Sequence, residues 1–135
     1  MIKFGTSGWR GIIGEDFTFE NVRIASQGVA NYLKRQHPDA GARGVIVGYD
    51  TRFLSEKFAS EAAKILAFNG IQAYLCNRDV PTPCVSFETV RRKALGAINF
   101  TASHNPPEYN GLKYSTANGA PALPDVTAVG EDTFD

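Results

Sequence analysis

The strongest constraint on the fold is an alternation of short apolar runs with longer amphipathic segments. Apolar residues recur at helical spacing over Phe19–Gln36, over Ser55–Phe68 and from Thr82 to about Arg92, which predicts helices there. The apolar runs typical of buried strands are Val45–Val47, Ile71–Leu75, Leu95–Phe100 and Leu112–Ser115. Strands that alternate with helices pair mostly in parallel. We therefore expect an α/β fold, a three-layer domain with a mixed, largely parallel sheet of about four strands flanked by helices.

Cap and turn signals separate these segments. Thr18 or Asp16 can cap the first helix, and Thr82-Pro83 is typical of an N-cap followed by proline at the first helical position. Gly5–Gly11 has the composition of a polar, glycine-rich turn, and Asn110-Gly111 is a signal for a tight turn before the last strand.

Composition excludes several classes of protein. The 135 residues fit one domain, and 14 Lys and Arg balance 14 Asp and Glu, whereas domains that bind duplex nucleic acid or anionic membranes usually carry a basic excess. No apolar run approaches the ~20 residues of a membrane span, and the N-terminus does not resemble a signal peptide. Cys76 and Cys84 with two distant histidines make no zinc quartet. We expect reduced thiols in a cytoplasmic protein that binds neither nucleic acid nor membrane.

Unusual polar residues gather in three segments that adjoin predicted strands: Gly5–Arg10, Asp50–Arg52 and Thr101–Pro107. In open α/β sheets, ligands bind at the loops that leave the carboxyl ends of the strands, so we expect a ligand site there. Gly5–Gly11 offers backbone N–H groups and the Arg10 guanidinium, both suited to a phosphate. Asp50-Thr51-Arg52 is best interpreted as an internal ion pair that braces a loop.

Ser103 is the candidate nucleophile or phosphate carrier of this loop set. It follows a buried strand and precedes two prolines that keep the backbone rigid. His104 is poorly placed as its base, because adjacent side chains rarely point the same way, and it fits better as a donor to an anion. Lys113 lies past the expected turn and can return beside the serine, where a lowered pKa would allow proton transfer. The alternatives are a turn without chemistry and a solvated surface lysine.

Together these segments resemble the α-D-phosphohexomutase family, which includes phosphoglucomutase and phosphomannomutase. The resemblance rests on Gly5–Gly11, Gly48–Arg52, Thr101–Pro107 and Tyr109–Lys113, in that order and spacing. Members of the family have four domains around a central cleft, and residues 1–135 resemble only domain I, which bears the phosphoserine. The aspartate-rich metal loop of domain II and the ligand loops of domains III and IV have no counterpart here. We therefore expect a piece of a longer protein, with residues 116–135 as a truncated tail.

The resemblance implies an isomerase of carbohydrate metabolism that depends on Mg²⁺ and interconverts sugar 1-phosphates and 6-phosphates. Its intermediate is a bisphosphorylated sugar. Glucose 1,6-bisphosphate is implied both as this intermediate and as an activator of the enzyme. Ser103 is implied to carry the phosphoryl group, whose oxygens bind the metal together with the missing aspartates. Lys113 is implied as general acid/base, and Arg10 and His104 as contacts to the phosphoryl group. The residues implied to bind substrate are Thr6, Ser7 and Arg10.

Two other functions stay open for the chain by itself. The first is a non-catalytic α/β module that binds sugar phosphate or docks on a partner, with domains II–IV as the expected partners. The second is a serine hydrolase, which needs a histidine able to reach Ser103, and His37 is the only one besides His104. Because the metal loop is missing, we expect the isolated chain to fold without mutase activity.

Overall fold

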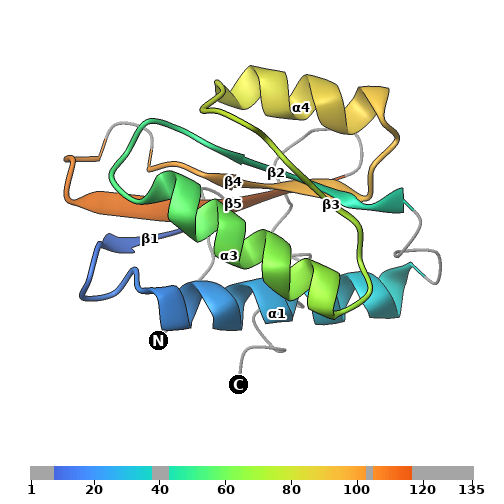
Figure 1. Cartoon of the computed structure of the whole chain (residues 1–135), viewed down its shortest axis with the longest axis horizontal. Helices are drawn as coiled ribbons and strands as arrows, with labels where there is room; N and C mark the ends of the chain where they lie inside the picture. The colour runs from blue at the N-terminus through green and yellow to red at the C-terminus, as the bar shows by residue number, and fades with distance from the viewer. Residues whose placement is uncertain (1–7, 38–42, 103–104, 117–135) are drawn as a thin grey trace.

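The described part of the chain forms an open sheet with helices on both faces. The computed structural model describes residues 8–37, 43–102 and 105–116. α4 lies on one side of the sheet, and α1 and α3 lie side by side on the other, which gives the expected three layers (Figure 1). The elements in chain order are β1 (Trp9–Ile12), α1 (Phe19–Gln36), β2 (Val45–Tyr49), α3 (Ser55–Phe68), β3 (Ala73–Leu75), α4 (Thr82–Arg91), β4 (Gly96–Phe100) and β5 (Tyr109–Thr116).

The sheet is mixed, with the strand order β1-β5-β4-β2-β3. β2 pairs in parallel with β3 and with β4, whereas β5 pairs antiparallel with β4 and with β1. The predicted α/β class with a mixed sheet is confirmed. The described residues contribute five strands rather than about four, because β1 adds an edge strand beside β5.

Two segments predicted to be turns belong to strands, so both predictions were wrong. β1 begins inside the glycine-rich Gly5–Gly11 segment, and Asn110-Gly111 lies within β5, opposite Gly11 and Arg10. The physical reason is tertiary. β1 and β5 pair with each other across about 100 residues of sequence, and this long-range pairing overrides the local turn preference of glycine and asparagine.

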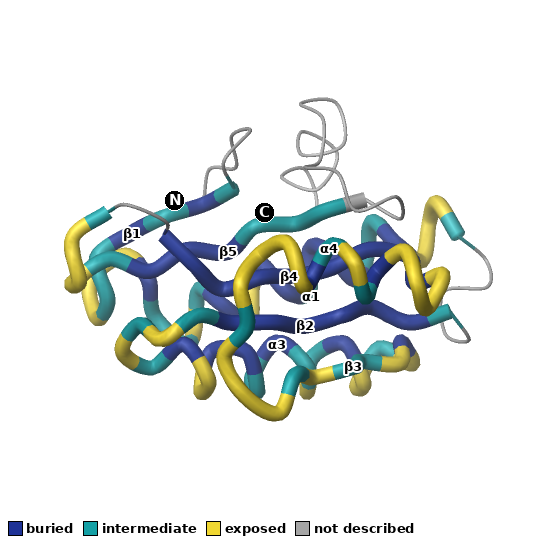
Figure 2. The backbone as a smooth tube through the Cα atoms, turned by 90° about the horizontal axis from the view of Figure 1, so that it is seen from above, coloured by how far each residue is buried: buried dark blue, intermediate teal, exposed yellow. Residues whose placement is uncertain are grey.

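The larger core lies between the sheet and the layer formed by α1 and α3. Trp9 stacks on Phe17 with ring centroids 4.5 Å apart, and Phe17 meets Phe58 edge-on at 4.9 Å. A smaller cluster under α4 contains Ile46 and Val85. β2 and β4 are buried along their whole length between the two clusters (Figure 2). The central strands therefore form a fixed base for the loops at their carboxyl ends.

The helix boundaries follow local chemistry. α1 begins after Thr18, whose hydroxyl accepts a hydrogen bond from the Asn21 N–H at 3.1 Å, so Thr18 rather than Asp16 is the cap. α4 differs from expectation by one residue, because Pro81 occupies the cap position and Thr82 is already helical.

Cys76 and Cys84 are free thiols, as predicted. Burial raises the pKa of the Cys76 thiol above its ordinary value, which keeps that group protonated. Within the three described ranges, no helix combines the length and the apolar character needed to cross a membrane.

Candidate active site

The segment that follows β4 carries the predicted site. The Thr101 N–H donates to the Gly111 carbonyl at 3.0 Å, and the Asn105 N–H donates to the Ala102 carbonyl at 3.0 Å. The first bond fixes the chain before Ser103 to β5, and the second joins the residues on either side of Ser103 and His104. Ser103, His104, Thr6 and Ser7 lie outside the described residues.

The Arg52 guanidinium binds main-chain carbonyls of the residues that follow Ser103. Its Nη2 donates to the Asn105 oxygen at 2.7 Å, and its Nη1 donates to the oxygens of Pro106 at 2.8 Å and Tyr109 at 3.0 Å. Its Nε lies 3.5 Å from a carboxylate oxygen of Asp50, and the arginine side chain is only 13% exposed. The predicted ion pair that braces a loop is confirmed, and the braced loop is the one that carries Ser103.

Arg52, its partner Asp50 and the carbonyls that Arg52 binds form a clamp on this segment. A second set of hydrogen bonds connects the clamp to β5. The other Asp50 oxygen accepts from the Ser55 hydroxyl at 3.0 Å, and that hydroxyl accepts from the Asn110 amide at 2.8 Å. The Asn110 side-chain oxygen in turn accepts from the Gly111 N–H at 2.8 Å. Ser55 and Asn110 are buried, and sequence reasoning missed both, because a turn signal gives no hint of a side-chain contact across 55 residues.

Arg10 enters the site from β1 and not from a loop. It lies opposite Gly111, and its Nη1 donates to the Asn105 side-chain oxygen at 2.5 Å. A Cβ on Gly111 would lie 2.9 Å from the Arg10 Cγ, 2.7 Å from the Thr101 carbonyl oxygen and 2.8 Å from the Trp9 carbonyl oxygen. Glycine is therefore needed at this strand position so that the arginine can cross over it.

Lys113 lies two residues beyond Gly111 on β5, so both share one face of the sheet with Arg10. Burial lowers the pKa of the Lys113 ammonium below its ordinary value, and the nearby charge of Arg10 lowers it further. Lys113 thus reaches the neighbourhood of Arg10 along a straight strand, without the predicted Asn110-Gly111 turn. The catalytic roles of the two residues stay predictions.

The described side chains around the loop supply cations rather than metal ligands. Residues 8–37, 43–102 and 105–116 contain no group of three His, Cys, Asp or Glu that could hold a metal ion. Of the nearby carboxylates, Asp50 already contacts Arg52 and Ser55 with its two oxygens, and Glu108 is an exposed residue of the segment itself. This donor set does not fit a resident Mg²⁺ ion, which prefers several free oxygen ligands.

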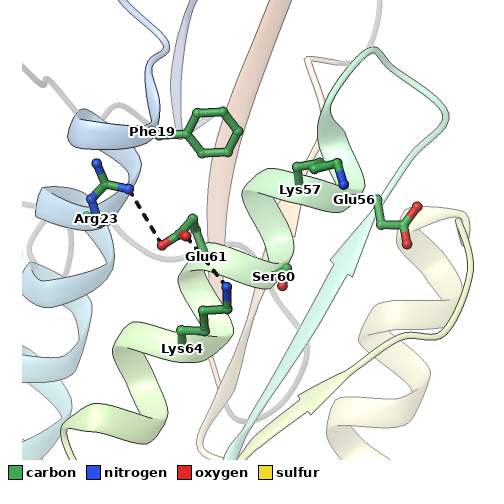
Figure 3. Close-up of a pocket in the computed structure, with 7 residues that line it drawn as sticks. All are labelled: Phe19, Arg23, Glu56, Lys57, Ser60, Glu61 and Lys64. Atoms are coloured by element: carbon green, nitrogen blue, oxygen red, sulfur yellow. Dashed lines mark ion pairs between the residues drawn. The ribbon is translucent and has the colours of Figure 1, made fainter.

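A groove of about 580 Å³ between α1 and α3 is lined mainly by charged side chains, three of which form ion pairs. Glu61 lies 3.6 Å from Arg23 and 3.8 Å from Lys64, with Phe19 at one end of the groove (Figure 3). Because the Glu61 carboxylate is shared between Arg23 and Lys64, the groove offers no cluster of reactive side chains. The loop beside Arg52 remains the candidate site.

The fold and the site together define a three-layer α/β/α domain in which Arg10 and Arg52 both bind Asn105, two residues after Ser103. The family model described as "Phosphoglucomutase/phosphomannomutase, alpha/beta/alpha domain I" matches residues 1–134. The chain therefore belongs to the α-D-phosphohexomutase family of phosphoglucomutases and phosphomannomutases, as its domain I.

Individual relatives agree with this assignment. A probable phosphoribomutase of Schizosaccharomyces pombe is 40% identical over 126 residues, covering 91% of this chain and 22% of the relative. A phosphoglucomutase of Staphylococcus saprophyticus is 38% identical, covering 94% of this chain and 23% of its own. The crystal structure of a protein assigned as a phosphomannomutase, from Thermus thermophilus, superposes with a TM-score of 0.92 at 37% identity, covering 99% of this chain and 30% of that one. The chain thus spans under a quarter of the length of these two curated relatives.

Proposed function

We propose that this chain is the phosphoserine-bearing domain of a phosphohexomutase that interconverts sugar 1-phosphates and 6-phosphates through a bisphosphorylated sugar. The observation that carries the proposal is the meeting of Arg10 and Arg52 at Asn105, two residues after Ser103, with Lys113 beside Arg10. Such an arrangement suits phosphoryl transfer, which needs positioning and charge neutralisation more than covalent chemistry by the protein.

In the proposed reaction, the bond between phosphorus and the Ser103 Oγ breaks as a sugar hydroxyl oxygen bonds to phosphorus. The hydroxyl proton passes by way of the Lys113 amine to the departing Ser103 Oγ. The bisphosphorylated sugar then reorients, and its other phosphoryl group returns to Ser103 by the reverse steps. The lowered pKa of Lys113 supports this role. It increases the fraction of neutral amine, and only the neutral amine can accept a proton. Arg10 and His104 neutralise the phosphoryl oxygens.

The remaining partners are proposed from family membership. When bound, Mg²⁺ would supply further charge neutralisation at the seryl phosphate, held by aspartates outside this chain. Thr6 and Ser7 are proposed to contact the substrate, glucose 1,6-bisphosphate to serve as intermediate and activator, and the cytoplasm to be the site of action. The names of the relatives indicate different sugars, since one is a phosphoribomutase and another a phosphoglucomutase. The proposal therefore covers the reaction type and assigns no sugar.

The test is Ser103→Ala in the full-length protein that carries this domain. Intact-mass spectrometry should find one phosphoryl group on the wild type and none on the variant, and turnover should fall to background. Ser60→Ala, on α3 in the groove of Figure 3, is the control and should keep both. Mutase activity near the wild-type level in Ser103→Ala would overturn the proposal.

The serine hydrolase alternative gains no support from the described residues. His37 is the C-cap of α1, at the end of the sheet where β2 begins. The segment that leads to Ser103 follows the end of β4, and Phe100 at that end pairs with Tyr49 at the end of β2. A β-strand rises about 3.3 Å per residue, so the length of β2 separates His37 from that segment.

A further inference from the structure

We propose that Arg52 is a positioning residue for phosphoryl transfer. It fixes the backbone that follows Ser103 and, through Asn105, the guanidinium of Arg10. The inference rests on the proposed function, since it takes Ser103 as the phosphoryl carrier. It adds a role for a residue that contacts the protein's own main chain rather than substrate.

Arg52 makes contacts at both ends of its guanidinium. Three carbonyl oxygens, those of Asn105, Pro106 and Tyr109, accept from it within 3.0 Å. A planar guanidinium can serve three acceptors at fixed angles, whereas an ammonium is a point charge without that directionality. Since two prolines already limit this segment, the clamp leaves its backbone little freedom.

Asn105 relays the clamp to Arg10. Its main-chain oxygen accepts from Arg52 and its side-chain oxygen accepts from Arg10, so one residue joins the two arginines. The Nε of Arg10 is buried and has no partner among the described residues, which leaves the Asn105 contact as the anchor of that guanidinium in the described part of the chain. Movement of the Asn105 peptide would therefore displace Arg10.

The clamp stands on rigid elements. Arg52 pairs with Asp50 immediately after β2, and Asp50 is held by the hydroxyl of Ser55, the first residue of α3. Sites supported from strands and helices are positioned more precisely than sites carried by loops alone. The segment that follows Ser103 is thus fixed relative to the central strands.

The experiment compares Arg52→Ala and Arg52→Lys with a matched control, Arg23→Ala, in the full-length protein. Arg23 also pairs with a carboxylate, at 3.6 Å, but lies on α1. We expect hydrogen exchange in residues 105–112 to speed up about tenfold in both Arg52 variants, with α1 unchanged. We expect kcat to fall about a hundredfold, as for a catalytic group displaced by an ångström, with KM within about threefold.

Two further readouts separate positioning from general destabilisation. Lysine should not restore kcat, and added guanidinium ion should partly rescue Arg52→Ala while methylammonium does not. A kcat for Arg52→Ala close to wild type, full rescue by lysine, or a loss confined to KM would each overturn the role of Arg52 while leaving the proposed function intact. A wild type without seryl phosphate or turnover would instead overturn the proposed function, and the role of Arg52 with it.

Discussion

The neighbours of Gly111 across the sheet leave no room for a side chain at this position. A side chain there would collide with two carbonyl oxygens and with the stem of Arg10. We expect Gly111→Ala to reduce the free energy of unfolding by about 1–3 kcal/mol, the usual cost of forcing an extra group into packed surroundings. Urea denaturation of the chain measures this. Ser115→Ala, further along β5, is the control and should stay within about 0.5 kcal/mol of wild type. Equal stability of the two variants would contradict the packing argument.

Lys113 and Arg10 make a second prediction at the residue scale. Because burial and then Arg10 lower the lysine pKa, NMR titration of its side chain should give a value below the ordinary 10.5. Arg10→Met removes the repelling charge, so the pKa should rise, yet stay below 10.5 because burial remains. No change in Arg10→Met would show that the two groups do not interact.

The same shift fixes the sign of a pH effect on stability. The folded pKa of Lys113 lies below the unfolded value, so between the two values the unfolded chain binds more protons. Measured against Lys113→Met, wild-type stability should therefore increase as the pH rises through the folded pKa toward 10.5. Urea midpoints of both proteins over that range provide the measurement, and a decrease would contradict the assigned direction.

Among the elements, the helices were the most predictable from sequence. The bounds of α1 and α3 match the predicted Phe19–Gln36 and Ser55–Phe68, because helical periodicity and caps are local properties. β1 was missed because two of its four residues, Arg10 and Gly11, are not apolar, and because its partner strand lies far along the chain. The same holds for the site. The ion pair of Asp50 with Arg52 was predictable from two neighbouring residues, whereas the bond between Asn110 and Ser55 was not.

The cap of α1 gives a prediction at the scale of one element. Thr18→Ala removes the oxygen that accepts from the Asn21 N–H, and should reduce the free energy of unfolding by about 1 kcal/mol. Thr18→Ser keeps that oxygen and should lie closer to wild type. Chemical denaturation of both variants measures the difference, and an alanine variant as stable as the serine one would exclude a capping role.

At the scale of the whole molecule, the hydrophobic core and the set of metal ligands make separate predictions. Two hydrophobic clusters enclose the sheet, so the 135-residue chain should unfold in one cooperative thermal transition. It should convert no glucose 1-phosphate, because its described residues offer no grouped metal ligands and it spans under a quarter of the two curated relatives reported above. A coupled assay with Mg²⁺ provides the measurement. Metal-dependent turnover by the purified chain would contradict this expectation.

The pairing of β1 with β5 has a consequence for synthesis on the ribosome. Trp9 lies opposite Leu112, so the first described strand has to wait for nearly the whole domain to leave the exit tunnel before its partner arrives. Until then α1, β2, α3 and β4 can assemble from contacts closer in sequence, while Arg10 has no strand to pair with. Contacts of such high sequence separation form late and slow the folding of a domain. The nascent chain would thus place Arg10 against β5 as one of the final steps of its folding.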